Sequence, residues 1–471
     1  MLPPKIMNTP IKPHHLTITA IIIMAISTGC ETEDGSAPLN DDQVRFMTLN
    51  PGHFHAALVQ MEMLEGVDET VHIYAPEGPD LDLHMDRIEE FNTREVNPAS
   101  WQTEIYTGED YLARMLDERP GNVVVTAGNN RLKTEYIYQS VDAGLNVLSD
   151  KPMAIDRDGW ELLVSAFERA DENDVLLYDI MTERSEVTSR LLRALTQNPD
   201  VFGNLQVGSA EDPAVELESV HHLFKYVGGQ PLRRPPWYFD VTQQGEGIVD
   251  VTTHLVDLSM WTLFPNQVIN HQHDIAMVEA ERWPTDVSRE QFGQITGEDD
   301  FPAYLQDQLD EDGVLPLYSN GSILYRIHSH YIRAAVQWDY QAPEGGDDTH
   351  HTTVRGTLSD LLVRQGPEQD YEATLYLRPT AQADRDAVEQ ALEQAVANLQ
   401  PEFPGMEVTP EGDEWRFDIP DELHLGHEAH FSLVANRFLQ YLEEGTLPEW
   451  EVPNMITKYY ITSQARNMAM E

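Results

Sequence analysis

Short apolar segments alternate with amphipathic ones from Val44 to Ile180, and this alternation limits the possible fold more than any other feature of the chain. The expected strands are Val44–Leu49, Val71–Ala75, Asn122–Ala127, Asn146–Ser149 and Val175–Ile180, and the expected helices are Ala56–Leu64, Leu132–Ala143 and Trp160–Asp171. Strands that alternate with helices in this way form a parallel, doubly wound sheet. We therefore predict an N-terminal Rossmann-type α/β domain over residues 43–180.

The pattern changes at about residue 203, where strand-like segments follow one another with few helices between them. The expected strands are Leu205–Ala210, Ser219–Lys225, Ser322–His328, Ala334–Tyr340, Val354–Arg364 and Ala373–Leu377, and the expected helices are Gly247–Phe264, Arg385–Leu399 and Glu428–Glu444. The acidic stretch from Asp286 to Asp312 is expected to be a surface excursion. Residues 181–471 are thus predicted to be a second α/β domain with a large, open, mostly antiparallel sheet and terminal helices that pack back.

The N-terminus has the features of an export signal. Lys5 and Lys12 precede an apolar run from Leu16 to Ser27, which is too short to span a bilayer. The small residues before Cys30, the only cysteine, resemble a bacterial lipoprotein signal. We expect residues 1–29 to be a signal peptide, Cys30 to be lipidated and residues 30–42 to be an acidic tether on the periplasmic face of the membrane. Plain secretion is the alternative.

The formal net charge of -51 limits the possible partners. Nucleic acids and anionic membranes repel such a surface, so we expect no nucleic-acid partner and no membrane contact beyond the lipid anchor. Lysine is scarce: after the signal segment only Lys133, Lys151, Lys225 and Lys458 occur. An acid-rich, lysine-poor surface is typical of salt-loving sources, and a lysine that persists in it is a candidate for a specific role.

The turn after the first strand occupies the position of a dinucleotide-binding glycine loop. Of the G-x-G-x-x-G pattern only Gly52 is present, because Asn50 replaces the first glycine and His55 the third. Asn50 tolerates the left-handed conformation that the first glycine normally adopts. No Arg or Lys lies between His72 and Met85, where a 2'-phosphate would need one, so NAD is favoured over NADP.

Two further motifs are more specific. Thr126-Ala127-Gly128-Asn129-Asn130 is followed by a helix and then by Ser149-Asp150-Lys151-Pro152, and Gly245-Glu246-Gly247 leads a predicted helix with Asp250, His254 and Asp257 on one face. Together they resemble the glucose-fructose oxidoreductase and inositol dehydrogenase family, whose members carry a Glu-Lys-Pro corner and a glycine-led Asp-x-x-x-His helix. The closing segment from Gly426 resembles an exported subgroup called putative oxidoreductases.

The resemblance implies a set of site residues. NAD would contact Asn50, Gly52, His53, Phe54, Ala127, Gly128, Asn129, Asp150 and Lys151. Lys151 would reach between nicotinamide and substrate, His254 would be the general base, and Asp250 would orient His254. Members of the family often pair through their C-terminal sheets, which implies a homo-oligomer.

Other residues are candidates for substrate contact. Lys225 and Trp237 lie in stretches where aromatic faces adjoin charged groups, which suits a sugar; Lys151, Asp250 and His254 complete the predicted substrate site. A sheet edge and a packed loop are the structural alternative. The histidines at His328, His330, His350 and His351 alternate or pair on strands, and with no supporting cysteine we expect no metal site.

The leading hypothesis is an NAD-dependent oxidoreductase that acts on a secondary hydroxyl of a sugar or glycoside. Outside the cytoplasm no nicotinamide pool reoxidises the cofactor, so we expect it to be tightly bound and recycled internally. One alternative is an NAD-dependent glycosidase that oxidises C3 transiently and eliminates the glycoside. Another is a redox-silent, sugar-binding lipoprotein, which the degenerate glycine loop would suit.

Overall fold

The computed structural model of the chain describes residues 43–227 and 230–471. The predicted signal peptide, Cys30 and the acidic tether lie outside this range. Within the described ranges, every helix is too short or too polar to cross a lipid bilayer.

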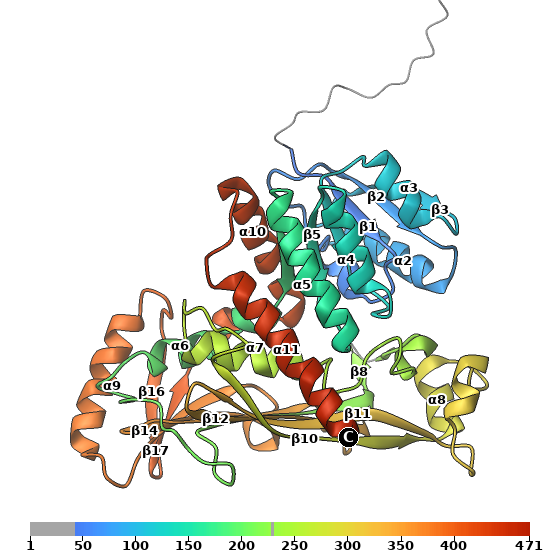
Figure 1. Ribbon diagram of the computed structural model, residues 1–471. Helices are drawn as coiled ribbons and strands as arrows, with labels where there is room; N and C mark the ends of the chain where they lie inside the picture. Colours follow the sequence, from blue (N-terminus) through green and yellow to red (C-terminus); the bar gives the residue numbers. More distant parts are fainter. Residues whose placement is uncertain (1–42, 228–229) are drawn as a thin grey trace, which may run out of the picture. The chain divides into compact units, whose positions relative to one another are not determined.

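The first sheet has six parallel strands in the order β3-β2-β1-β4-β5-β6 (Figure 1). The strands are β1 (Phe46–Leu49), β2 (Thr70–Ala75), β3 (Gln102–Thr107), β4 (Val123–Thr126), β5 (Asn146–Asp150) and β6 (Leu177–Ile180). All residues of β1, β4 and β6 are buried, as expected for strands covered on both faces. The order reverses between β1 and β4, so the loops after these strands meet at a topological switch point. The predicted Rossmann-type fold is confirmed.

The helices of this part are α1 (His55–Leu58), α2 (Pro79–Thr93), α3 (Tyr111–Glu118), α4 (Lys133–Asp142) and α5 (Arg157–Glu172). The predicted helix Ala56–Leu64 is wrong in length, because α1 ends after Leu58. The carbonyl of Gln60 accepts a hydrogen bond from the Trp101 indole at 2.7 Å, and that of Met61 accepts one from the Arg94 guanidinium at 2.7 Å. These side chains bind carbonyls that a longer helix would use internally.

The second sheet has nine strands in the order β10-β11-β12-β7-β13-β14-β15-β17-β16. They are β7 (Val215–Phe224), β10 (Ile275–Val287), β11 (Leu315–Ile327), β12 (His330–Gln341), β13 (Thr349–Arg355), β14 (Ser359–Gln365), β15 (Thr374–Pro379), β16 (Glu407–Glu411) and β17 (Glu414–Asp418). Only the β12–β7 pair is parallel, so the predicted large, mostly antiparallel sheet is confirmed. In a separate two-stranded sheet, β8 (Tyr226–Val227) pairs antiparallel with β9 (Gln230–Pro231).

Helices cover one face of the second sheet. The helices that follow β6 are α6 (Val187–Thr196), α7 (Thr252–Leu263), α8 (Arg289–Thr296), α9 (Arg385–Leu399), α10 (His427–Glu444) and α11 (Glu451–Met470), with 3-10 turns at η1 (Thr182–Ser185), η2 (Pro236–Phe239), η3 (Ala303–Gln308), η4 (Pro367–Gln369) and η5 (Asp421–Leu423). Leu191 of α6, Leu255 of α7 and Leu392 of α9 share one apolar core with Leu217 and Ile323 of the sheet. Burial of this core anchors α7, which carries site residues.

Three sequence predictions in this part need correction. Leu205–Ala210 forms isolated bridges rather than a strand. Val354–Arg364 is not one strand but the β13–β14 hairpin, because the chain turns at Gly356, where any side chain would overlap the Phe202 carbonyl. The acidic stretch from Asp286 is not only a surface excursion, because it contains the helix α8. The N-terminus of α8 is capped by reciprocal hydrogen bonds between Ser288 and Gln291, a capping box.

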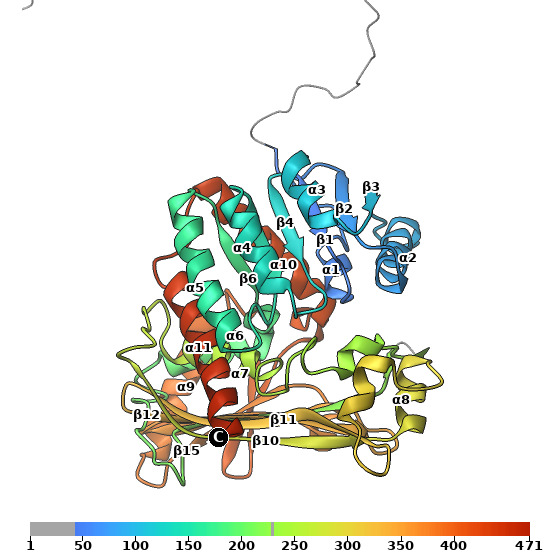
Figure 2. The same cartoon turned by 45° about the vertical axis from the view of Figure 1, so that its right-hand side comes forward.

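The last two helices pack back against the first sheet (Figures 1 and 2). Phe431 and Phe438 of α10 and Tyr459 of α11 belong to the same core as β1 and β5. Farther along, Ile461 of α11 joins the core of the second sheet, so this helix contacts both layers.

A buried charge network fixes α11 at this junction. The Lys458 ammonium lies 2.6 Å from Asp179 on β6 and 2.9 Å from Asp257 on α7. Arg184 donates to both oxygens of Asp257 at 2.7 Å and to Glu451 at 3.0 Å. Burial alone raises the pKa of Asp257, but the two cations outweigh it and hold that pKa well below its ordinary value.

Replacing Lys458 by methionine should destabilise the protein by about 3–5 kcal/mol, since it keeps the side-chain length but removes the cation that pairs with the buried Asp179 and leaves Asp257 with Arg184 alone. The measurement is the free energy of unfolding from chemical denaturation. Arg169→Ala is the control, because its pairs with Asp142 and Glu172 are solvent-exposed and should contribute less than about 1 kcal/mol. Equal effects of the two changes would contradict a structural role for the network.

Candidate functional site

Lys151 directly follows β5 and is joined to Pro152 by a cis peptide bond. Its ammonium donates to Asp250 Oδ1 at 2.7 Å, while Asp250 Oδ2 accepts from the Gln244 side chain at 2.9 Å. Burial alone lowers the pKa of Lys151 and raises that of Asp250, but their mutual attraction reverses both shifts, with Gln244 adding to the effect on Asp250. The structure thus pairs two of the three predicted catalytic residues as a buried ion pair.

His254 lies in the first turn of α7 and does not have the partner expected from the sequence. Asp250 precedes the helix and binds Lys151 and Gln244, while Asp257 binds Arg184 and Lys458. The prediction that Asp250 orients His254 is therefore wrong. Among the described residues, none bonds to the buried Nδ1 atom of His254. Burial, followed by the charge of Lys151, holds the pKa of His254 well below its ordinary value, so the imidazole is neutral near pH 7.

His254 lines a cavity of about 400 Å³ between α6, α7, the start of α10 and strands β7 and β13. Besides His254, the polar residues that line it are Glu183, Glu186, Thr188, Ser189, Ser219, His221, Lys225, Asp347, Asp348, Thr349, His350, Thr352, Gln365 and His427. The predicted Lys225 is here, and its ammonium lies 2.7 Å from Asp348, which also pairs with His221 and His222. A lining with this many donors and acceptors suits a ligand with several hydroxyl groups.

Two groups in this region were missed as site residues in the sequence. Asp348 lies just before β13 with no motif around it, so only the contact between distant strands identifies it. His427 opens α10, and its ring lies 5.6 Å from that of His55. The Gly426-His427 pattern was visible in the sequence, but its position beside the first sheet depends on how the last helices pack back.

The glycine-loop residues lie at the switch point but are already engaged. Asn50 has the predicted left-handed conformation, with φ of 46°. The backbone N–H groups of Gly52 and His53 both donate to the Ala127 carbonyl, at 3.1 and 3.2 Å. Gly128 packs so tightly here that a Cβ atom would lie 2.6 Å from the Asn50 carbonyl. Asn129 donates to the Gln243 side chain at 2.6 Å. Donors that would hold a diphosphate therefore bind protein instead.

Trp237 covers the same loop rather than the polar cavity. Its indole donates to Asp80 Oδ2 at 2.8 Å. A Cβ atom on Gly52 would lie 3.0 Å from that carboxylate oxygen and 3.4 Å from the indole ring. An aromatic ring and a carboxylate thus occupy the space in which this glycine would admit a pyrophosphate. As arranged here, the residues at this loop do not fit the diphosphate of a dinucleotide.

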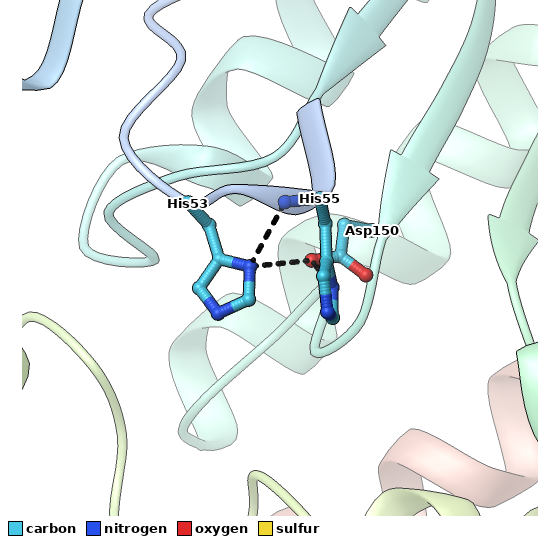
Figure 3. A group of neighbouring side chains, drawn as sticks. All are labelled: His53, His55 and Asp150. Atoms are coloured by element: carbon cyan, nitrogen blue, oxygen red, sulfur yellow. Dashed lines mark hydrogen bonds and ion pairs between the residues drawn. The ribbon is translucent and has the colours of Figure 1, made fainter. Parts of the chain in front are cut away.

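Asp150 faces two histidines of the glycine loop (Figure 3). Its Oδ2 atom lies 2.9 Å from His55 Nδ1 and 4.0 Å from His53 Nδ1, and the His55 backbone N–H donates to His53 Nδ1 at 3.3 Å. Burial holds the pKa of both imidazoles well below the ordinary value. Nearby, the buried Lys133 donates to the Asp150 backbone carbonyl at 3.1 Å, and burial lowers its pKa to about 8.

Comparison with known proteins identifies the family. Residues 191–470 match the family model described as "Putative oxidoreductase C terminal domain". A putative oxidoreductase from Parabacteroides merdae is 49% identical, with 91% of this chain and 98% of that chain covered and a TM-score of 0.89. The chain belongs to this family of putative oxidoreductases. Membership confirms the resemblance seen in the sequence and supports a general oxidoreductase role.

More distant structures share the fold. A putative oxidoreductase from Thermotoga maritima is 14% identical, with 91% of this chain and 98% of that chain covered and a TM-score of 0.57. Levoglucosan dehydrogenase, solved in complex with NADH and levoglucosan, is 12% identical over the same shares, also with a TM-score of 0.57. A search of curated proteins finds no match.

The cavity predicts a pH-dependent stability. Burial, with the charge of Glu186, raises the pKa of Glu183 from 4.5 to about 7 although Lys151 opposes the shift. The stabilisation from this proton is complete below the unfolded-state pKa and is lost as the pH rises through 7. At pH 8.5 the free energy of unfolding of Glu183→Gln should therefore be about 1–3 kcal/mol higher than that of the wild type. At pH 4.5 the two free energies of unfolding should be nearly equal. Denaturant titrations at both pH values measure this.

Glu168→Gln is the control for this experiment, because Glu168 is exposed on α5 and its replacement should have the same small effect at both pH values. A Glu183→Gln variant whose advantage did not grow between pH 4.5 and pH 8.5 would show that Glu183 titrates as an ordinary surface carboxylate.

Proposed function

We propose that the protein is an oxidoreductase that acts on a secondary hydroxyl of a sugar or glycoside. The observation that carries this proposal is the arrangement of Lys151, fixed by Asp250, and a neutral His254 beside a polar cavity. A neutral imidazole can accept a hydroxyl proton, and an ammonium can donate a hydrogen bond to the same oxygen.

Each of these residues has a defined task. The His254 imidazole accepts the proton of the substrate hydroxyl. The Lys151 ammonium stabilises the negative charge that develops on that oxygen. Asp250 is a positioning residue for Lys151 rather than for His254, because both of its oxygens are bound, one by Lys151 and one by Gln244. Lys225 and Asp348 are placed to bind further hydroxyl groups of the substrate.

The substrate class follows from the cavity lining, in which most residues carry a charged or hydrogen-bonding group beside apolar surface from residues such as Leu192 and Val251. Levoglucosan dehydrogenase, which shares the fold, has been solved with levoglucosan and with L-sorbose, and both support a sugar ligand here. Trp237 is not part of the proposed sugar site, because its indole lies over Gly52.

A nicotinamide dinucleotide is the electron acceptor that the related folds favour. Levoglucosan dehydrogenase was solved with NADH, and a biliverdin reductase from Synechocystis with NADP+ at 10% identity, so the choice between the two stays open, although the sequence favours NAD. Because the loop at Gly52 is closed by Ala127 and Trp237, a dinucleotide requires these contacts to give way. The same closed loop favours a second candidate function, a sugar-binding protein without redox activity.

Other parts of the proposal rest on the sequence. From the sequence we propose that the protein is exported and lipidated at Cys30. An exported enzyme would have to recycle its cofactor internally. A glycosidase that oxidises C3 transiently and then returns its cofactor would also meet this requirement. Net hydrolysis of a glycoside without accumulation of a keto sugar would favour the glycosidase. We also propose a homo-oligomer and, given the net charge of -51, no nucleic-acid partner.

Lys151→Ala and His254→Ala should each reduce turnover of a sugar substrate at least about 100-fold, since each removes a group that acts on the reacting oxygen. Steady-state assays measure turnover, and circular dichroism checks the fold. His351→Ala, which changes an exposed histidine of β13, is the matched control and should retain activity. Full activity in either site variant would exclude that residue from catalysis.

Dinucleotide binding provides a separate test. Mass spectrometry of the denatured, purified protein detects any retained NAD or NADP, and calorimetry measures binding of added cofactor. If Trp237 closes the loop, Trp237→Ala should bind the dinucleotide about tenfold more tightly than the wild type, whereas Trp237→Phe, which keeps an aromatic ring, should change affinity less. If none of the three proteins retains a cofactor and none binds added cofactor, the sugar-binding function would be favoured.

A further inference from the structure

We propose that His53, His55 and Asp150 bind a divalent transition-metal ion of the zinc type. The three side chains come from the loop after β1 and the end of β5, and their candidate ligand atoms all lie within 4.8 Å of one another (Figure 3). This inference does not rest on the proposed sugar chemistry. It differs from the sequence analysis, which assigned His53 and Asp150 to a dinucleotide and expected no metal.

The spacing is close to that of a metal site. In tetrahedral zinc sites, bonds of about 2.0–2.1 Å place neighbouring ligand atoms roughly 3.4 Å apart. Asp150 Oδ2 lies 2.9 Å from His55 Nδ1 and 4.0 Å from His53 Nδ1, so the two separations bracket that value. For His53 Nδ1 to bind an ion, the ring has to turn away from the His55 backbone N–H, from which this atom now accepts a hydrogen bond at 3.3 Å.

The site is held on one side and open on the other. The side chains of Asp150 and His55 are 5% and 9% exposed, and the His55 ring packs 4.5 Å from that of Phe431. His53 is 21% exposed and lines a cavity of about 60 Å³ with Gly52 and Phe54. This cavity gives a hydrated ion a route in and leaves room for water as a further ligand.

Charge and ligand type favour a cation of this class. Within the described part of the chain, the ion-pair partners of Asp150 are the two histidines, and Lys133 donates to its backbone carbonyl rather than to its carboxylate. A buried carboxylate among imidazoles is stabilised by a bound cation. Two nitrogen ligands and one oxygen ligand suit zinc, cobalt, nickel or iron, whereas magnesium and calcium prefer oxygen alone.

The test is titration of the chelator-treated, purified protein with Zn²⁺ alone, followed by calorimetry, and with Co²⁺, followed by visible absorption. High salt and excess Mg²⁺ suppress weak binding to a surface with a net charge of -51. We expect one tight site per chain and a Co²⁺ spectrum with nitrogen ligation. His55→Ala and Asp150→Asn should each weaken Zn²⁺ binding at least about 100-fold.

Matched variants keep the result interpretable. His72→Ala removes an imidazole that also faces a carboxylate, that of Glu104 at 3.3 Å. Among the residues that the structure describes, this pair has no third candidate ligand, so the variant should bind Zn²⁺ like the wild type. If Asp150→Asn fails to fold, His53→Ala, at the more exposed ligand, provides the second measurement. No stoichiometric site in the wild type, or equal affinity in the wild type, His53→Ala and His55→Ala, would overturn the proposal.

Discussion

The ammonium group of Lys458 links β6 of the first sheet to α7, the helix that carries His254 and covers the second sheet. Asp179 comes from β6 of the first sheet, Asp257 from α7 above the second sheet, and Lys458 from the helix that ends the chain. Burying these charges is favourable only when all partners are present, which makes the junction specific as well as stable. It places α7, with His254 on its first turn, beside the carboxyl end of β5, where Lys151 lies.

The scarcity of lysine makes the roles of the remaining lysines visible. Lys151 pairs with Asp250, Lys225 with Asp348 and Lys458 with two carboxylates, while the buried Lys133 supports the Asp150 backbone. None of the four is an ordinary solvated side chain within the described part of the chain. In this acidic, lysine-poor chain, each of these four lysines therefore lies where its ammonium group has a carboxylate or a buried carbonyl as partner.

The loop after β1 shows how a Rossmann-type scaffold can be adapted. A dinucleotide loop needs free backbone donors and small residues, because the diphosphate approaches the backbone closely. Here the donors of Gly52 and His53 bind Ala127, Trp237 lies over Gly52, and His55 occupies the third glycine position beside Asp150. Lys151 and His254 of the two family motifs are present at the same time, so the chain combines these motifs with a glycine loop whose backbone donors and free space are already occupied.

The sequence by itself determined the two sheets and most of their strands, because apolar periodicity is a local property of the chain. Its short motifs and scarce lysines also singled out Lys151, Asp250, His254 and Lys225 as candidates. Local pattern did not show where α1 ends, since side chains of Trp101 and Arg94 terminate it. Only the tertiary structure decided that Asp250 serves Lys151 rather than His254, that Asp348 and His427 reach the cavity, and that His53, His55 and Asp150 converge. These contacts join residues far apart in the chain, and the packing of buried elements, not sequence spacing, sets the direction in which each side chain points.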